Sequence, residues 1–329
     1  MQTRKLGPFE ISALGLGCMS LSHAYGTPPD AETAGNVLLK ALDLGYRFID
    51  TAALYGFGAN ETLIGDTLKQ RRGHYVLASK CGMFRNAQGL REVDGRPEIL
   101  TKTCEDSLKR LQTDVIDLYY LHRWDKRIPI EDSIGAMSDM VKQGKVRTIG
   151  LSEVSADTLR KAHRVHPITA VQTEYSLWTR NPEIAVLDAC KELGVVFVAF
   201  SPLARGFLTG ELRDMSVLPP KDIRLAMPRF QGAHFQNNLK LLDEFSSIAR
   251  ENDCTMAQLA LAWLLAKAFH IIPIPGTTRL DHLTENARGP EVRLLPGAME
   301  RMDTLINADT VSGPRYNSAT LPEIDTEGS

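Results

Sequence analysis

The sequence predicts an α/β protein in which eight parallel strands alternate with helices and close into a (β/α)8 barrel. Short apolar runs alternate along the 329 residues with longer stretches of helical period, a rhythm typical of a parallel sheet covered by helices. The runs are apolar at nearly every position, as expected of strands buried on both faces. Eight such units in a chain of this length favour a closed barrel over an open sheet.

The elements follow one another in a regular order. The chain opens with a predicted hairpin, in which Thr3–Leu6 turns at Gly7-Pro8 into Phe9–Ser12. The eight predicted strands are Leu14–Leu16, Arg47–Ile49, Tyr75–Ala78, Ile116–Leu121, Thr148–Leu151, Ala170–Thr173, Val195–Phe200 and Ile271–Ile274. Helices are predicted at 31–44, 100–111, 134–143, 156–165, 184–193 and 239–252. Three of these helices end at or just before a glycine, the residue that most often ends a helix.

Residues 205–238 form a long connection between the seventh and eighth strands, rich in Pro, Gly and charge. A connection of this length is uncommon in a compact domain unless it serves a functional site, so we expect a lid there. No linker or shift in composition divides the chain. We therefore expect one domain over residues 1–310, followed by a loose polar tail at 311–329.

Composition and charge narrow the class of protein. The net charge is -2, with 38 Lys and Arg against 40 Asp and Glu, which argues against a nucleic-acid surface or a binder of acidic membranes. The five cysteines are scattered, without a CxxC pair, so neither a disulfide framework nor a zinc site is indicated. Because no apolar signal segment or membrane-spanning stretch is present, we expect a soluble, cytoplasmic protein.

Polar or ionisable residues follow nearly every predicted strand, and in such barrels the active site lies at the carboxyl ends of the strands. Asp50 ends the second strand with Tyr55 five residues later, Lys80 ends the third, and His122 ends the fourth. Each alone has an ordinary structural explanation as a cap, a packed ring or a solvated charge. Because they come from three neighbouring strands, we expect them to converge at one barrel mouth.

Together the four side chains suggest a proton donor aimed at a carbonyl oxygen. A tyrosine, with a reference pKa of about 10, is a poor acid at neutral pH. The Lys80 cation would stabilise the phenolate and make Tyr55 a better donor, while Asp50 would pair the lysine. His122 can hydrogen-bond a substrate oxygen and orient it. No nucleophile–base pair or set of metal ligands accompanies them, which suggests that a cofactor supplies hydride.

On these residues the chain resembles the aldo-keto reductases. The motifs Phe48-Ile49-Asp50-Thr51-Ala52-Ala53-Leu54-Tyr55-Gly56, Ser79-Lys80 and Leu121-His122 agree in order and spacing, and the similarity runs from Leu6-Gly7 to Glu285-Asn286. The resemblance implies a TIM barrel and a catalytic tetrad of Asp50, Tyr55, Lys80 and His122. It also implies an NADPH-dependent oxidoreductase that reduces aldehydes or ketones to alcohols, with a small-molecule carbonyl compound as its partner. The stretch Ser201 to Gly206 and the run Gly276-Thr277-Thr278-Arg279 resemble the bacterial, fungal and plant branch that includes pyridoxal, perakine and auxin-induced-type reductases.

The resemblance further implies which residues bind NADPH or NADP+. Gln172 and Ser152 would hold the nicotinamide carboxamide, and Phe200 would stack on the ring. The loop after Phe200 would hold the pyrophosphate, and the segment after the eighth strand the adenosine 2′-phosphate and adenine. The complete set is Cys18, Met19, Ser152, Gln172, Phe200, Ser201, Leu203, Gly206, Gly276, Thr278, Arg279, Glu285 and Asn286. Four aromatic residues are expected to line the substrate pocket: Tyr25, Trp124, Trp178 and Phe230.

Two positions depart from the family pattern. Glu153 stands where many members carry Asn, and an ionised carboxylate accepts hydrogen bonds but cannot donate them to a carboxamide. Pro275-Gly276 stands where some branches place a basic residue. That substitution leaves Arg279 and backbone amides to bind the 2′-phosphate.

Two other functions are compatible with the sequence. Lys80 could be the Schiff-base lysine of an aldolase, but this needs a lowered pKa and Asp50 should keep the lysine charged. The chain could instead be a non-catalytic regulatory or redox-sensing subunit of the same fold. Voltage-gated potassium channel β subunits resemble reductases in this way, yet they lack the histidine that is His122 here. The intact tetrad favours the enzyme.

Overall fold

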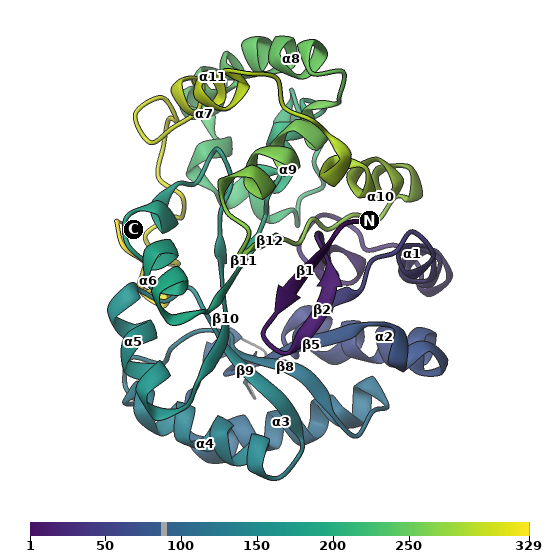
Figure 1. Cartoon of the computed structure of the whole chain (residues 1–329), viewed down its shortest axis with the longest axis vertical. Coiled ribbons are helices and arrows are strands. Elements are labelled where there is room, and N and C mark those ends of the chain that lie inside the picture. Colours follow the sequence, from purple (N-terminus) through teal and green to yellow (C-terminus); the bar gives the residue numbers. More distant parts are fainter. Residues whose placement is uncertain (87–90, 329) are drawn as a thin grey trace.

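The computed structural model describes residues 1–86 and 91–328, and it confirms the predicted barrel (Figure 1). Eight parallel strands are hydrogen-bonded in the order β12-β11-β10-β9-β8-β5-β4-β3. All eight lie where the sequence predicts strands: β3 (Leu16–Gly17), β4 (Phe48–Asp50), β5 (Val76–Cys81), β8 (Ile116–Leu121), β9 (Val146–Ser152), β10 (Ile168–Glu174), β11 (Val196–Phe200) and β12 (Ile271–Pro273).

The first and last strands meet and close the sheet. The Gly15 amide donates to the Pro273 carbonyl at 3.0 Å, and the Gly17 amide donates to the Pro275 carbonyl at 3.2 Å. A Cβ atom on Gly17 would lie only 2.8 Å from the Ile274 carbonyl oxygen. The join therefore requires glycine, because a side chain would push the two strands apart.

Helices surround the strands on the outside (Figure 1). The six predicted helices are present, with ends shifted by a few residues, and α2, α7, α9, α10 and α11 are added to them. The helices are α1 (Ala31–Asp43), α2 (Ala59–Leu68), α3 (Pro97–Leu111), α4 (Ile130–Lys142), α5 (Ala156–Val165), α6 (Val186–Leu193), α7 (Gly232–Leu239), α8 (Leu241–Glu251), α9 (Met256–Lys267), α10 (Leu280–Ala287) and α11 (Ala298–Leu305). Among the described residues, none of these helices is both long and apolar enough to cross a membrane.

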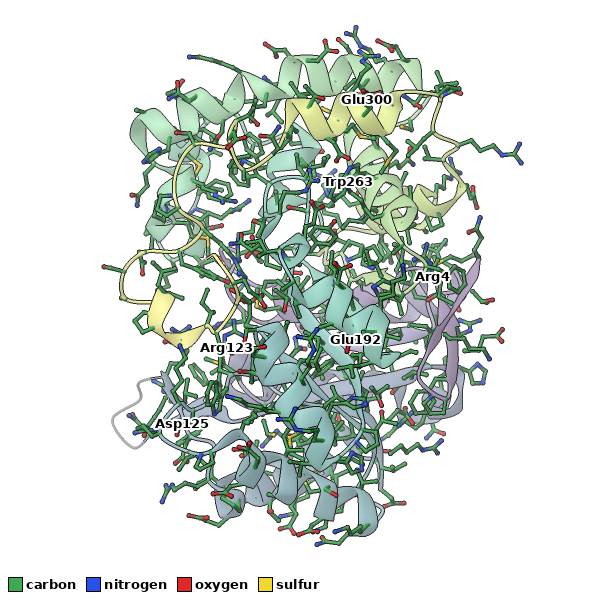
Figure 2. All side chains as sticks on the ribbon, turned by 60° about the vertical axis from the view of Figure 1, so that its left-hand side comes forward. Arg4, Arg123, Asp125, Glu192, Trp263 and Glu300 are labelled. Atoms are coloured by element: carbon green, nitrogen blue, oxygen red, sulfur yellow. The ribbon has the colours of Figure 1, made fainter. Side chains whose placement is uncertain are left out.

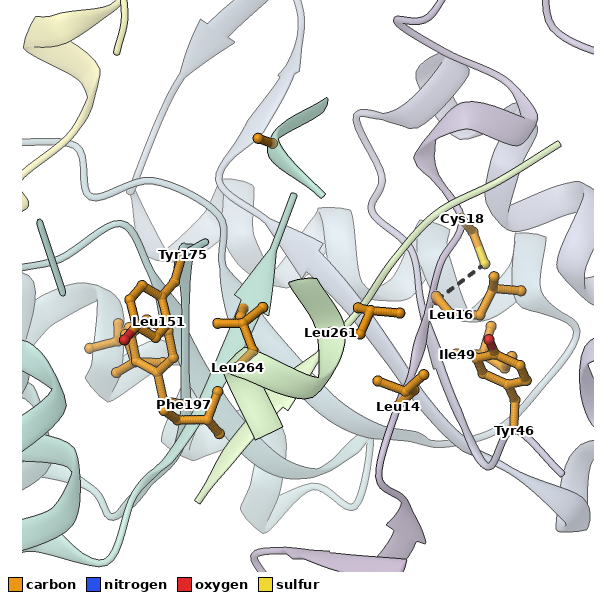
Figure 3. Close-up of a cluster of buried hydrophobic side chains, with 14 of the residues drawn as sticks. Leu14, Leu16, Cys18, Tyr46, Ile49, Leu151, Tyr175, Phe197, Leu261 and Leu264 are labelled. Atoms are coloured by element: carbon orange, nitrogen blue, oxygen red, sulfur yellow. Dashed lines mark hydrogen bonds between the residues drawn. The ribbon is translucent and has the colours of Figure 1, made fainter. Parts of the chain in front are cut away.

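Two hydrophobic clusters hold the barrel together. The larger one fills the space between strands and helices, and Figure 3 shows part of it, with Leu261 and Leu264 of α9 and Phe197 of β11. The smaller one lies inside the barrel. It groups Leu6 and Ile11, from the N-terminal hairpin β1 (Thr3–Leu6) and β2 (Phe9–Ser12), with strand residues that include Phe48 and Val196, the first residues of β4 and β11. The predicted hairpin thus closes the amino end of the barrel and leaves the carboxyl end free for a site.

The connection between β11 and β12 is ordered as a series of short helices. It contains 3-10 turns at Ala204–Thr209, Met215–Val217, Ile223–Ala226 and Pro228–Phe230, followed by α7. The Ile223 amide donates to the Ala24 carbonyl at 3.0 Å, so this connection reaches the loop that follows β3. It therefore crosses the mouth of the barrel, as expected of a lid.

The C-terminal segment differs from the loose tail that we expected. Residues 311–328 pack against the barrel, and the buried Arg315 contacts both Glu153 and Glu174. The Asp325 carboxylate accepts hydrogen bonds from the amide and hydroxyl of Ser155. Polar composition alone suggested looseness, but these polar groups find partners on the barrel and can be buried.

A small second hairpin, β6 (Met83–Arg85) and β7 (Arg91–Val93), follows β5 and was not predicted from the sequence. Its strands have only three residues each. They are too short to show a periodic pattern.

Candidate active site

A cavity of about 800 Å³ lies at the carboxyl end of the strands. Its lining includes the last residues of four strands: Gly17 of β3, Asp50 of β4, Ser152 of β9 and Phe200 of β11. Side chains from the lid and from the C-terminal segment complete its walls. The cavity therefore occupies the position where this kind of barrel places its chemistry.

Lys80 is the centre of the predicted tetrad. Its Nζ lies 2.5 Å from Asp50 Oδ1, 2.7 Å from the Thr51 carbonyl oxygen and 3.3 Å from the Tyr55 hydroxyl. The lysine side chain is fully buried, so its charge depends on these three neighbours. The structure thus brings Asp50, Tyr55 and Lys80 into one hydrogen-bonded group.

Local backbone geometry aims these side chains. Strand β5 pairs with β4 on one side and β8 on the other, with Lys80 opposite Tyr120. Tyr55 begins a tight turn in which Gly56 and Gly58 have φ of 56° and 96°. Glycine adopts this left-handed conformation without strain, so the chain reverses at once and keeps the Tyr55 ring over the strand ends.

His122 completes the tetrad from the end of β8. Its ring meets the Tyr55 ring edge-on, with centroids 5.9 Å apart. Burial, and then the nearby Arg123 and Lys80 cations, hold the pKa of His122 well below its usual value, so the imidazole is neutral. Its Nδ1 is buried with no hydrogen-bond partner among the described residues. A neutral imidazole can still donate one hydrogen bond to an oxygen in the cavity.

Lys80 acts on Tyr55 in the expected direction, since its charge and its hydrogen bond lower the pKa of the phenol. Burial raises the pKa of Tyr55 and outweighs the effect of the lysine. The pKa of Lys80 is also raised, because Asp50 and Tyr55 outweigh the effect of burial. At neutral pH the tyrosine therefore keeps its proton and the lysine keeps its charge, a combination that suits a proton donor.

Every residue predicted to bind the cofactor lines the cavity. These residues are Cys18, Met19, Ser152, Gln172, Phe200, Ser201, Leu203, Gly206, Gly276, Thr278, Arg279, Glu285 and Asn286. The two residues predicted to hold the carboxamide already have polar partners in the protein: Gln172 donates to Asp50 Oδ2 at 2.7 Å, and the Ser152 hydroxyl accepts from Arg123 at 3.2 Å. Their predicted role as a carboxamide clamp stays a prediction.

The loop after β11 has the backbone shape of an anion site. Ser201, Ala204, Arg205 and Gly206 all have φ between 49° and 90°. Left-handed residues next to right-handed ones turn backbone N–H groups toward one concave side, which suits phosphate oxygens. The residues present therefore fit a pyrophosphate in this part of the cavity.

Arg279 lies at the outer end of the cavity and is already paired. Its Nε lies 3.1 Å from Asp281 Oδ1, and its Nη2 contacts the other oxygen of the same carboxylate. Both side chains are more than half exposed to solvent. A phosphate that binds Arg279 must therefore compete with Asp281 for the guanidinium.

Three of the four aromatic residues predicted for the substrate pocket do not line the cavity; Tyr25 does. Trp178 stacks on Phe207 with ring centroids 4.2 Å apart, and Phe230 meets Trp178 edge-on. Trp124 donates its indole N–H to the Ile128 carbonyl. These predictions were wrong because the sequence shows which residues are aromatic but not which face of a loop carries them.

Glu153 has a structural role that the sequence did not reveal. Its backbone is left-handed, with φ 56°, and its carboxylate accepts from the Glu174 amide at 2.9 Å and from Arg315. Glu153 does not line the cavity. The acidic residue at this position therefore anchors the C-terminal segment rather than facing a carboxamide.

Several cavity residues were missed from the sequence. Arg123 directly follows His122, so its place in the motif was a signal that could have found it. Tyr316 and Glu323 belong to the C-terminal segment, where no motif marks them. Figure 2 shows the labelled Arg123 beside this segment.

Known proteins are similar to this chain over nearly its whole length. Residues 13–307 match the model of the aldo/keto reductase family. The chain is 41% identical over 319 residues to a probable aldo-keto reductase of Glycine max, covering 96% of this chain and 92% of that protein. It is 43% identical over 320 residues to the NADP(+) aldo-keto reductase yakc of Schizosaccharomyces pombe, covering 95% and 94%.

Solved structures give the same result. The chain superposes on a glycerol dehydrogenase of Gluconobacter oxydans with a TM-score of 0.86 and 27% identity, covering 95% of this chain and 97% of the other. An aldo-keto reductase of Klebsiella pneumoniae in complex with NADPH gives a TM-score of 0.75 and 25% identity, covering 98% of both chains. With its barrel, its tetrad and these relatives, the chain belongs to the aldo/keto reductase family.

Proposed function

We propose that this protein is an NADPH-dependent oxidoreductase that reduces the carbonyl group of an aldehyde or ketone to an alcohol. The observation that carries the proposal is the contact of Lys80 with both Asp50 and the Tyr55 hydroxyl at the floor of the cavity. Two relatives support the choice of cofactor: the Schizosaccharomyces pombe protein is named for NADP(+), and the Klebsiella pneumoniae structure holds NADPH.

The cavity fits this cofactor at three places. Phe200 offers a ring face near the tetrad, the loop from Ser201 to Gly206 offers an anion-binding backbone, and Arg279 offers a cation at the outer end. When bound, NADPH would supply the hydride for the carbonyl carbon.

The protein's own residues would handle the proton. Tyr55 gives its hydroxyl proton to the carbonyl oxygen as negative charge develops there. Lys80, 3.3 Å away, stabilises the phenolate that is left, and Asp50 keeps the lysine charged and in place. The neutral His122 donates a hydrogen bond that positions the same oxygen.

The structure argues against the aldolase alternative. A Schiff-base lysine must be deprotonated to attack a carbonyl. The Nζ of Lys80 forms three hydrogen bonds, and the pKa of Lys80 is raised, so the lysine stays protonated. The regulatory alternative is disfavoured because His122 is present and its ring lies against Tyr55.

The test is to mix the purified protein with NADPH and a panel of aldehydes, ketones, quinones and pyridoxal. We expect loss of NADPH absorbance with at least one carbonyl compound, and one alcohol formed per NADPH consumed. A parallel sample treated with borohydride should show no substrate attached to Lys80 by mass spectrometry. NADPH that stays unconsumed across the panel, or a borohydride adduct on Lys80, would contradict the proposal.

A further inference from the structure

The arginines that line the cavity differ in whether they pair with a carboxylate. Five arginines line it within the described residues, and four of them have a carboxylate partner. The pairs are Arg91 with Glu323, Arg205 with Glu174, Arg224 with Asp222, and Arg279 with Asp281. The fifth, Arg123, has no carboxylate within 4 Å in the part of the chain that the structure describes.

Within residues 1–86 and 91–328, the hydrogen-bond partners of Arg123 are neutral groups. Its Nη1 donates to the His122 carbonyl at 2.6 Å and to the Ser152 hydroxyl at 3.2 Å. Its Nε is buried and has no hydrogen-bond partner among the described residues. A partly buried guanidinium with an unused donor and no counter-charge costs free energy. An anion that binds there would recover that free energy.

The position of Arg123 in the cavity indicates which ligand would carry this anionic group. Arg123 directly follows His122, its Nη1 contacts the His122 carbonyl and the Ser152 hydroxyl, and it lines the cavity together with Asp50 and Tyr55. Arg123 therefore lies at the end of the cavity that holds the tetrad. The left-handed loop that fits a pyrophosphate follows β11, and strands β9 and β10 separate it from β8.

We propose that the carbonyl substrate carries an oxyanion group, a carboxylate or a phosphate, within a few bonds of its carbonyl, and that Arg123 binds this group. The inference rests on the proposed function and adds a substrate class to it. A guanidinium forms a planar fork of donors that matches two oxygens of a carboxylate or phosphate. With His122 and Tyr55 on the carbonyl oxygen and Arg123 on the anion, the substrate is held at two points.

Two pairs of compounds test the proposal by steady-state kinetics with saturating NADPH. Succinic semialdehyde is compared with its methyl ester, and glyceraldehyde 3-phosphate with glyceraldehyde. We expect the wild-type protein to prefer one anionic compound over its neutral partner, and the pair that shows the preference identifies carboxylate or phosphate. In Arg123→Leu, kcat/KM for that anionic compound should fall about 10- to 150-fold, the range for a hydrogen bond to a charged group. The value for its neutral partner should fall much less, so that the preference for the anionic compound narrows.

Matched variants separate a substrate contact from a general effect of charge or folding. Arg164→Leu removes the same charge from the exposed surface of α5 and should change neither compound. Arg123→Lys keeps the charge but loses the fork, and should retain part of the preference. The dissociation constant of NADPH, measured by fluorescence, should change much less in Arg123→Leu than kcat/KM for the anionic compound does.

Three results would overturn the inference and leave the proposed function standing. They are an equal loss for charged and neutral compounds, a weaker NADPH affinity in Arg123→Leu that accounts for the whole loss, and wild-type turnover of other aldehydes without preference for either anion. If the wild-type protein consumes no NADPH with any carbonyl compound, the proposed function itself fails, and the inference falls with it.

Discussion

The two ends of the cavity carry the same kind of ion pair in opposite surroundings. At the inner end, the side chains of Lys80 and Asp50 are 0% and 2% exposed, and the pair is bonded to Thr51, Tyr55 and Gln172. At the outer end, Arg279 and Asp281 are 58% and 63% exposed. Burial makes the inner pair a permanent part of the machinery, since neither charge can be left alone. Because solvent surrounds the outer pair, Arg279 can leave Asp281 and bind a ligand.

The largest expected effect comes from the inner end. Tyr55→Phe removes the proton donor and little else, because the ring and its packing against His122 stay. Carbonyl reduction should fall about 10²- to 10⁴-fold, the usual contribution of general acid catalysis. NADPH affinity, measured by fluorescence titration, should stay the same. Turnover close to wild type would assign the proton to another group.

Lys80→Met tests whether the inner pair is indispensable. It leaves Asp50 buried without its counter-ion, and breaking such a pair costs about 3–5 kcal/mol of unfolding free energy, measurable by urea denaturation. Because the Lys80 cation opposes the rise in the pKa of Tyr55, its loss should raise that pKa further. The basic limb of the pH–rate profile for any residual reduction should then move to higher pH.

The double variant Lys80→Met with Asp50→Asn is the control for this test. It removes the unpaired charge and should recover part of the lost stability without recovering turnover. If Lys80→Met were as stable as the wild-type protein, the buried pair would contribute nothing to the free energy of unfolding.

At the outer end the effects should be smaller and confined to binding. Arg279→Ala should weaken NADPH about tenfold, the low end for a charged hydrogen bond, because the side chain is more than half exposed. NADH lacks the 2′-phosphate, so its affinity should barely change. Equal weakening of both cofactors would mean that Arg279 supports the loop without contacting the phosphate.

Asp281→Asn should give the smallest change and the opposite sign. It frees the Arg279 guanidinium from its exposed partner, so NADPH should bind up to about fivefold more tightly. In the double variant that combines Asp281→Asn with Arg279→Ala, this tighter binding of NADPH should disappear. Weaker NADPH binding in Asp281→Asn would show that the carboxylate orients the arginine instead of competing for it.

The inner end could be predicted from the sequence because its residues are tied to regular elements. Asp50, Lys80 and His122 stand at the ends of neighbouring parallel strands, so the barrel brings them together whatever the loops do. The eight strands were equally predictable, since each is a buried apolar run. The same reasoning explains why the barrel was confirmed and why the four tetrad side chains lie together, while their catalytic roles stay predictions.

The walls of the cavity could not be predicted in this way. Arg315 and Glu153 are 162 positions apart, and no local pattern joins them. Trp178 and Phe230 were taken for pocket residues because they are aromatic, yet they pack on Phe207 and on each other. Tertiary contacts decide which side of a loop faces the cavity, and periodicity carries no information about them.

The anchoring of the C-terminal segment affects the order in which the parts of the cavity form during synthesis. A chain is synthesised from its amino end, so all four tetrad residues leave the ribosome before Tyr316 and Glu323, which form a wall of the same cavity. A nascent chain therefore carries the tetrad side chains before it has an enclosed cavity, and it gains that enclosure only when Arg315 reaches Glu153 and Glu174.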